Sequence, residues 1–301
     1  MCVRVQRDDN GWATLKAAPV WWYGAPGVRR CQKIEEQFAA ETAEHHMHRK
    51  AWIRHHCDDF TTGNRMTGNT SNKLIFDIGF HSGDDAIHFL ELGFRVVAID
   101  ANPFMIEDGL RRPVLRLAKQ RGRLNAIARG VVREVARANQ TLTFFLHRRV
   151  TEWSTFKVPS AGVRGDFDPI NVPITTCADL IRQYGTPYYM KVDIEGFDSE
   201  CLASLEVDHL PTYVSTEDPL QLDHLLRLGY HSFKMVSQRL TRRGGRQFSG
   251  GLSESAPGQW GDAASIRSHP FFSTIHMHVR IDGNGNRIRE EHDLHAKLGT
   301  M

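Results

Sequence analysis

Acidic residues close four short apolar runs of this sequence. The acids are Asp77, Asp100, Asp193 and Glu217, and each preceding run has the composition of a buried strand. In an open α/β sheet the ligand lies beyond the carboxyl ends of the strands, so acids in that position are candidates for binding and catalysis. Each could instead be a turn or helix-capping residue, because short polar side chains are common in both places. Four such acids along one chain favour a shared site.

The first of these acids opens a glycine-rich loop with the pattern D-x-G-x-x-x-G, formed by Asp77, Gly79 and Gly83. Glycine lets the backbone approach a ligand closely, but this spacing differs from the G-x-G-x-x-G of nicotinamide and flavin sites. A carboxylate at the end of the first strand would repel a pyrophosphate and suit a cation. Asp100 follows about two dozen residues later, where a carboxylate can accept hydrogen bonds from both ribose hydroxyls. The pair predicts a positively charged adenosine ligand, and S-adenosylmethionine has that chemistry.

Strand and helix patterns alternate from Lys73 onward, and these elements must position the acids. The stretch from Lys73 to Pro103 predicts a strand, a glycine loop, a helix and a second strand. Further strands are expected at 124–128, 141–146, 188–192, 211–217, 231–238 and 273–281, the last followed by a polar tail. Helices are expected after an N-cap at Thr176, over 198–205, and up to a stop at Gly229. The alternation is typical of an α/β fold whose mostly parallel sheet carries helices on both faces.

Residues 1–70 differ from the remainder, and we interpret them as an N-terminal extension with one helix, at 32–56. Residues 71–301 then form the main domain. Histidines of that helix, together with Cys57 and Asp58, could supply metal ligands. His-rich polar tracts are more often exposed helix or linker, so we expect no metal there.

The composition is close to that of an average soluble globular protein. Apolar residues make up 41% and charged residues 24% of the 301 residues. No apolar run is long enough to span a bilayer, and the N-terminal segment lacks the apolar core of a cleavable signal peptide. Five scattered cysteines, an odd number, argue against a disulfide framework and favour a reducing compartment. We therefore expect a cytoplasmic protein with no membrane partner.

The net charge of +3 is too small to indicate a nucleic-acid binder. One local exception is the stretch 111–137, which holds nine Lys or Arg residues and a single acid, Glu134. Such a stretch is either a solvated helix face or a surface that attracts an anionic substrate. We favour the solvated face.

Several motifs, in order along the chain, resemble those of the FkbM-type S-adenosylmethionine-dependent methyltransferases. They are DIGFHSGD (77–84), VVAIDANP (96–103), NAIA (125–128), VPITTCADLI (172–181), YMKVDIEGFDSECLASL (189–205), FSGG (248–251), Trp260 and DLHA (293–296). The KVDIEG block at 191–196 is the most specific of them. His81, Asp84-Asp85 and Cys177-Ala178 depart from the family pattern, which bears on the acceptor more than on the cofactor.

This resemblance implies a Rossmann-like class I methyltransferase fold and transfer of a methyl group from S-adenosylmethionine. The usual acceptor is a hydroxyl oxygen of a sugar, polyketide or similar small molecule. The expected cofactor-binding residues are Asp77, Gly79, Phe80, His81, Gly83, Asp84, Asp100, Ala101, Asn102, Ala126 and Asp193.

Methyl transfer from a sulfonium is an in-line displacement, so the acceptor oxygen must be held against the methyl group and must lose its proton. The expected catalytic residues are Asp193, His81 and Glu217. Asp193 is expected to act as the base or to bind the cofactor's ammonium, and Glu217 to orient the acceptor. Histidine is the residue type that titrates near neutral pH, but a loop histidine such as His81 could equally bond the backbone. Lys191 is interpreted as structural.

Alternatives stay open at this point. Asp193 and Glu217 could together hold a divalent cation, but the sequence displays no dense carboxylate cluster, so we do not favour a metal. An N-directed or nucleotide-related methyltransferase has support only from the basic stretch 111–137. A third hypothesis is a non-catalytic module that binds S-adenosylmethionine. The glycine spacing disfavours an NAD-linked oxidoreductase.

Overall fold

The computed structural model describes residues 73–134, 140–238, 252–253, 256–270, 272 and 292–299, together with the backbone of short strands at 3–7, 13–17, 278–281 and 287–290. The chain divides into two compact units, Met1–Met66 and Thr67–Met301. In the first unit, β1 (Val3–Arg7) and β2 (Ala13–Ala17) pair as antiparallel strands, which the sequence pattern did not predict. The helix expected at 32–56 lies outside the described residues, and the roles assigned to 1–70 and 71–301 stay predictions.

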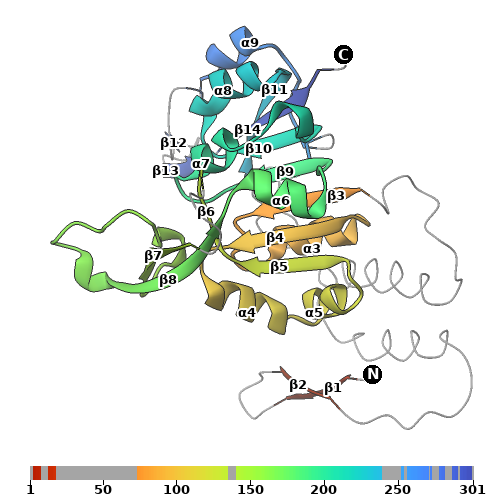
Figure 1. The fold of residues 1–301 in the computed structure, drawn as a ribbon, viewed down its shortest axis with the longest axis vertical. Helices are drawn as coiled ribbons and strands as arrows, with labels where there is room; N and C mark the ends of the chain where they lie inside the picture. Colours follow the sequence, from red (N-terminus) through yellow and green to blue (C-terminus); the bar gives the residue numbers. More distant parts are fainter. Residues whose placement is uncertain are drawn as a thin grey trace, which may run out of the picture. The chain divides into compact units, whose positions relative to one another are not determined.

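A seven-stranded sheet forms the centre of the second unit (Figure 1). Its strands are β3 (Leu74–Ile78), β4 (Arg95–Asp100), β5 (Leu124–Ala128), β9 (Tyr189–Val192), β10 (Tyr213–Thr216), β11 (Tyr230–Ser237) and β14 (His292–Leu298). They lie in the order β11-β14-β10-β9-β3-β4-β5. Only β14 runs antiparallel to its neighbours in this sheet. This order, with one reversed strand near the edge, is the class I methyltransferase form of the Rossmann-like sheet, so the predicted fold class is confirmed.

Helices cover both faces of the sheet, because the strands are apolar on both sides. The helices are α3 (Asp84–Glu91), α4 (Pro103–Arg111), α5 (Pro113–Gln120), α6 (Cys177–Tyr184), α7 (Asp198–Ala203), α8 (Leu222–Leu228) and α9 (Ala263–Arg267). One core joins α6, α7 and α8 to the face that holds Phe76 and Met190. The other joins α3, α4 and α5 to the face that holds Ile75 and Tyr189. Successive residues of one strand thus enter opposite cores, as the alternation of side chains requires. Among the described residues, no helix is long and apolar enough to cross a membrane.

Helix ends follow the local sequence signals. The Thr176 side chain accepts a hydrogen bond from the backbone N–H of Asp179 at 2.9 Å and begins α6 as predicted. Asn102 does the same for α4 through the N–H of Phe104, at 3.0 Å. Gly229 ends α8 in the left-handed conformation that glycine adopts without strain.

A smaller three-stranded sheet extends from the main one. It contains β6 (Gly130–Val131), β7 (Thr141–His147) and β8 (Phe167–Thr175), and β8 was not predicted. Figure 1 shows β7 and β8 projecting beyond the carboxyl ends of β4 and β5. We call residues 140–175 the arm. Between its strands lie the short 3-10 turns Thr151–Trp153 and Arg164–Asp166.

The closing strand of the sheet was misplaced by the sequence pattern. We expected the last strand at 273–281, but β12 (His278–Ile281) pairs with β13 (Arg287–Glu290) in a separate two-stranded sheet. The expected polar tail instead supplies β14, which lies between β10 and β11. Polar residues such as Asp293 and His295 are fully buried in this strand, and their presence hid its pattern.

One disulfide joins α6 to α7, between Cys177 and Cys201. Both side chains are fully buried. The sequence argument against disulfides missed this pair, because cysteines 24 positions apart carry no spacing that identifies a bond. Disulfides persist mainly in oxidising environments, so this pair runs against the expected reducing compartment.

Reduction of the disulfide is expected to lower the free energy of unfolding. A bond that closes a loop of this length restricts the unfolded chain by about 3.5 kcal/mol. The measurement is urea unfolding with and without reductant, after mass spectrometry of the alkylated, unreduced protein has counted its free thiols. The double variant Cys177→Ala, Cys201→Ala is the control, and its unfolding must not respond to reductant. Alkylation of both cysteines before reduction would contradict the bond.

Candidate functional site

Lys191 lies at the centre of a group of buried carboxylates. Its Nζ lies 3.1 Å from Asp85 Oδ2, 3.2 Å from Asp193 Oδ2 and 3.5 Å from Asp77 Oδ1. It also donates to the backbone oxygen of Gly79 at 3.2 Å. Asp77 and Lys191 are opposite each other in the pairing of β3 with β9, and Asp85 comes from the first turn of α3. One ammonium group therefore ties two strands and a helix together at the carboxyl end of the sheet.

Burial determines the electrostatics of this group. It raises the pKa of Asp77 to about 7, against the attraction of Lys191 and with added repulsion from Asp85 and Asp193. Burial lowers the pKa of Lys191, but the three carboxylates outweigh it, so this pKa lies well above its ordinary value. Within the described part of the chain, Asp77 Oδ2 has no hydrogen-bond partner. This orphaned oxygen fits a site that receives a donor or a cation.

The glycine loop packs directly against β9. Gly79 has a φ of 97°, and a Cβ at this position would lie 1.8 Å from the backbone oxygen of Asp193. No other residue type fits there. The backbone N–H of His81 donates to Asp100 Oδ2, and that of Asn102 donates to Asp100 Oδ1, both at 2.8 Å. Asp77 and Asp100 thus lie on either side of the glycine loop.

The other expected cofactor residues differ in their surroundings. Asp84 pairs with Arg112 at 2.7 Å and accepts a hydrogen bond from Ser82 Oγ at 3.1 Å, so it holds the loop to the start of α5. Phe80 is buried in the core, where its ring lies against Gly83. The remaining residues, Ala101, Asn102 and Ala126, are partly or fully buried near the ends of β4 and β5. Their contacts with a cofactor stay predictions.

A second group of acids lies beside the first. Carboxylate oxygens of Asp193, Glu195 and Glu217 all lie within 4.8 Å of one another. Glu195 has a φ of 51°, in the left-handed region that non-glycine residues seldom adopt. Asp198 holds the backbone of this group in place, because its carboxylate accepts hydrogen bonds from the backbone N–H groups of Ile194 and Glu217, both at 3.0 Å.

Asp293 borders this group from β14. The Gln238 side chain donates to Glu217 Oε1 at 2.6 Å and to Asp293 Oδ1 at 3.0 Å, so the two carboxyls share one amide nitrogen. Burial raises the pKa of Asp293 to about 8, and repulsion from Asp193 adds to it. Burial also raises the pKa of Glu217 well above its usual range, with Asp193 as the largest repelling charge. Burial and mutual repulsion therefore favour the protonated forms of Asp293 and Glu217.

His81 contacts the arm. Its Nε2 lies 3.1 Å from Thr151 Oγ1 and 3.3 Å from Glu152 Oε1. This contact occupies the ring that the sequence offered as a base, although 47% of the side chain is exposed. His81 therefore connects the glycine loop, to which it belongs, with the arm.

The predicted residues are brought together only in part. Asp77, Asp193 and Glu217 share one continuous acidic region, whereas Asp100 lies across the glycine loop. Four further residues belong to the site but received no role from the sequence. They are Asp85, Asp198, Gln238 and Asp293. Asp293 stood in a quoted motif, DLHA, and that was the one available signal for it.

The basic stretch 111–137 makes internal contacts. Arg112 pairs with Asp84, Arg123 donates to two backbone oxygens near α3, and Arg133 bonds Glu200. These contacts favour the reading of a solvated surface that is partly used for structure.

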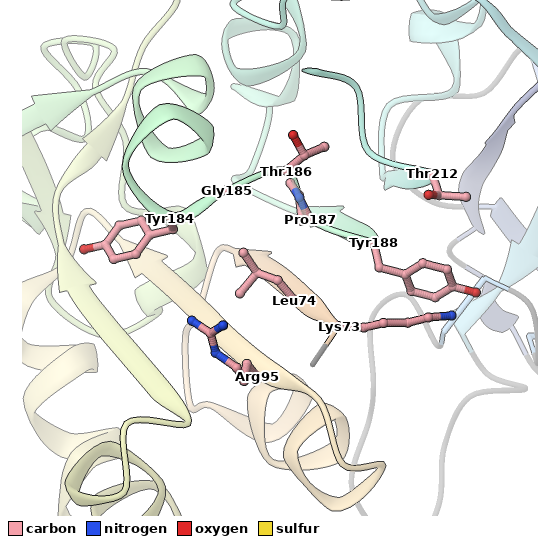
Figure 2. Close-up of a pocket in the computed structure, with 9 residues that line it drawn as sticks. All are labelled: Lys73, Leu74, Arg95, Tyr184, Gly185, Thr186, Pro187, Tyr188 and Thr212. Carbon is pink, nitrogen blue, oxygen red and sulfur yellow. The ribbon is translucent and has the colours of Figure 1, made fainter. Parts of the chain in front are cut away.

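A hollow of about 360 Å³ lies at the opposite end of the sheet (Figure 2). It is formed where β3, β4 and β9 begin, and its lining includes Lys73, Arg95 and Tyr188. The Lys73 Nζ lies 3.7 Å from the centre of the Tyr188 ring. Because ligands of open α/β sheets lie at the carboxyl ends, this hollow is separate from the acidic site.

The sequence profile described as the methyltransferase FkbM domain matches residues 77–232, more than half of the chain. The chain belongs to the FkbM methyltransferase family. The match begins at Asp77 and continues into β11, so it contains both acidic groups except Asp293. The FkbM domain is thus an S-adenosylmethionine-dependent methyltransferase, and the resemblance seen in the motifs is confirmed.

Solved structures with some likeness to the FkbM domain are distant. Precorrin-6y C5,15-methyltransferase from Geobacter metallireducens GS-15 is 9% identical with a TM-score of 0.34, over 76% of this chain and 82% of that one. A SAM-dependent methyltransferase from Methanosarcina mazei is 12% identical with a TM-score of 0.25, over 77% of this chain and 95% of that one. These scores are too low to carry an argument, and the strand order alone supports the fold. No match was found among curated proteins.

Replacement of Gly79 by alanine is expected to destabilise the FkbM domain by about 2 to 6 kcal/mol, because it adds backbone strain to an overlap. The overlap is with the backbone oxygen of Asp193, which cannot move without moving β9. Urea unfolding measures the change. Gly165→Ala is the matched control, since a Cβ there meets no atom within 4 Å. Equal stability of the two variants would contradict the close approach.

Stability of the cofactor-free protein is expected to fall as the pH rises from about 4 to about 7. The pKa of Asp77 is 3.8 when unfolded and about 7 when folded, so the folded state binds an extra proton between those values. One such proton changes stability by up to about 1.4 kcal/mol per pH unit, or about 3 to 5 °C in unfolding temperature.

The measurement is the unfolding temperature from pH 5 to pH 8, where Asp77→Asn must reduce the slope. Asp108→Asn, a change at a side chain that is 71% exposed, is the control. An unchanged slope in Asp77→Asn would remove Asp77 as the source.

Proposed function

We propose that the FkbM domain methylates a hydroxyl oxygen of a small molecule such as a sugar or polyketide. The observation that carries the proposal is the pair of acidic groups that meet at Asp193, one beside the glycine loop and one at the ends of β9 and β10. In this proposal the cofactor lies beside the first group and the acceptor beside the second, and Asp193 borders both.

The residues present fit the cofactor. Gly79 leaves the space that a Cβ would fill, and Asp77 Oδ2 is an unpartnered buried acceptor in the described part of the site. When bound, S-adenosylmethionine supplies a methyl group on a sulfonium. Asp100 would accept the ribose hydroxyls, since each of its oxygens has a second lone pair beyond its backbone donor. Asp77 and Asp193 would face the positive charges of the methionine portion.

The acceptor side is formed by Asp193 and Glu217. Either carboxylate can take the hydroxyl proton as the acceptor oxygen forms its new bond to carbon, and the other can orient the hydroxyl. Lys191 holds Asp193 Oδ2 at 3.2 Å and so fixes the direction of this carboxylate. His81 acts as a positioning residue, because its ring bonds the arm.

The arm supplies an aromatic surface near the site. Trp153 is 63% exposed and lies two residues from Thr151, the partner of His81. An exposed indole is suited to stacking on a sugar ring or an apolar acceptor. The small net charge of +3 favours a small acceptor over nucleic acid, and the cytoplasmic location stays a prediction from composition.

Calorimetry with S-adenosylhomocysteine tests the cofactor side. We expect binding to the unmodified chain and a loss of about 10- to 100-fold in affinity for Asp100→Ala, since hydrogen bonds to a carboxylate are lost. Asp108→Ala is the control. Heat with NAD but none with S-adenosylhomocysteine would refute the proposal.

The acceptor is identified by a screen of hydroxylated small molecules with labelled S-adenosylmethionine, followed by mass spectrometry. With an acceptor found, Asp193→Ala is expected to abolish transfer. A variant at this position with full activity would exclude Asp193 from the mechanism, and a product methylated on nitrogen would replace the O-directed assignment.

A further inference from the structure

We propose that Arg112 is a positioning residue, which holds the glycine loop against Asp100 and so orients that carboxylate for the cofactor. This role deepens the proposed function and rests on it, because Asp100 is the residue expected to accept the ribose hydroxyls of S-adenosylmethionine. Arg112 belongs to the basic stretch 111–137, for which the sequence favoured a solvated helix face. Its effect on the cofactor passes through the loop and not through a contact of its own.

The local sequence places Arg112 at a corner between two helices. The first helix, α4, ends at Arg111, and α5 begins at Pro113. The ring of a proline disfavours the helical conformation in the residue before it, and Arg112 is extended, with a φ of −65° and a ψ of 126°. The chain therefore turns at Arg112, and its side chain extends to the glycine loop.

The guanidinium of Arg112 bonds the glycine loop at two points. Nη1 donates to the backbone oxygen of Ser82, and Nη2 donates to Asp84 Oδ1, both at 2.7 Å. The side chains of Arg112 and Asp84 are 31% and 26% exposed, so solvent screens this pair less than it screens a fully exposed pair. The planar fork of arginine makes both bonds with one group, which the compact ammonium of lysine does not do. The loop is therefore fixed to the start of α5.

The part of the loop that Arg112 holds is strained. His81 has a φ of 43°, in the left-handed region that non-glycine residues seldom adopt. Such a backbone persists only where its surroundings over-determine it. The N–H of His81 donates to Asp100, and its ring contacts Thr151 of the arm. The bond from Arg112 to Ser82, the next residue, is a third restraint on the same segment.

These restraints orient the carboxylate of Asp100. Its Oδ2 accepts the N–H of His81 and its Oδ1 accepts that of Asn102, both at 2.8 Å. Loss of the Arg112 bonds would let the strained loop relax, and the N–H of His81 would turn away from Oδ2. A carboxylate held by two N–H groups binds two neighbouring hydroxyls without first losing its rotational freedom. Arg112 thus contributes to cofactor affinity by preorganising Asp100.

Calorimetry with S-adenosylhomocysteine on a double-mutant cycle tests this role. We expect Arg112→Ala to bind about 5- to 20-fold more weakly than the unmodified chain, because the loop loses two hydrogen bonds to a charged group. In the Asp100→Ala background the same change is expected to alter affinity by less than about twofold, since the residue through which it acts is gone.

Two further variants complete the calorimetry. Arg112→Lys keeps the charge but not the fork, so its affinity is expected to lie between those of Arg112→Ala and the unmodified chain. Arg111→Ala is the matched control, because this neighbouring arginine is 70% exposed and pairs with Glu107 and Asp108 on its own helix. It must bind S-adenosylhomocysteine as the unmodified chain does.

Hydrogen exchange at the backbone N–H of His81, followed by NMR on the full chain without ligand, tests the loop by itself. Exchange is expected to be about tenfold faster in Arg112→Ala, because the loop opens more easily when its restraint is lost. The rate in Arg111→Ala is expected to match that of the unmodified chain. An equal rate in Arg112→Ala and the unmodified chain overturns the positioning role.

The calorimetry separates this role from the proposed function. If the unmodified chain binds S-adenosylhomocysteine, then equal affinity in Arg112→Ala, or a full second loss in the Asp100→Ala background, overturns the positioning role and leaves the methyltransferase assignment intact. If the unmodified chain gives no heat with S-adenosylhomocysteine while exchange at His81 is faster in Arg112→Ala, the proposed function is overturned and the hold of Arg112 on the loop is supported.

Discussion

A buried ammonium group is the constraint on which the rest of this structure depends. Lys191 is 3% exposed and forms ion pairs with Asp77, Asp85 and Asp193 at once. Charges in a protein interior are stable only when they are paired, and removing one partner of a buried pair costs about 3 to 5 kcal/mol. Without Lys191 the three carboxylates would repel one another across β3, β9 and α3. Lys191 therefore joins the central strands β3 and β9 and also holds the carboxylates of the site together.

Two regions of different chemical character meet at Asp193. The glycine loop and Asp100 form a region of tight backbone contacts, in which the approach of Gly79 to β9 leaves no space for a side chain. The ends of β9, β10 and β14 form a region rich in carboxylates. The first region is suited to one fixed cofactor.

Local signals in the sequence predicted much of this. Apolar runs placed β3, β4, β5, β9, β10 and β11, and capping residues such as Thr176 and Gly229 placed helix ends. Asp77, Asp193 and Glu217 were recognised because an acid after an apolar strand is visible without a structure. Asp85 and Gln238 were not, since their partners lie far away in sequence. Neither the Cys177–Cys201 bond nor the buried polar strand β14 has a local pattern.

The position of β14 has a consequence for how the molecule forms during synthesis. This strand, His292–Leu298, lies between β10 and β11, although both precede it along the chain by more than fifty residues. A growing chain on the ribosome that has released β11 must leave a gap in its sheet until β14 emerges. The unpaired edges of β10 and β11 are exposed during that interval, and such edges are templates for wrong pairing. The step that fills the gap also delivers Asp293, so folding of the sheet and completion of the acidic site are one event.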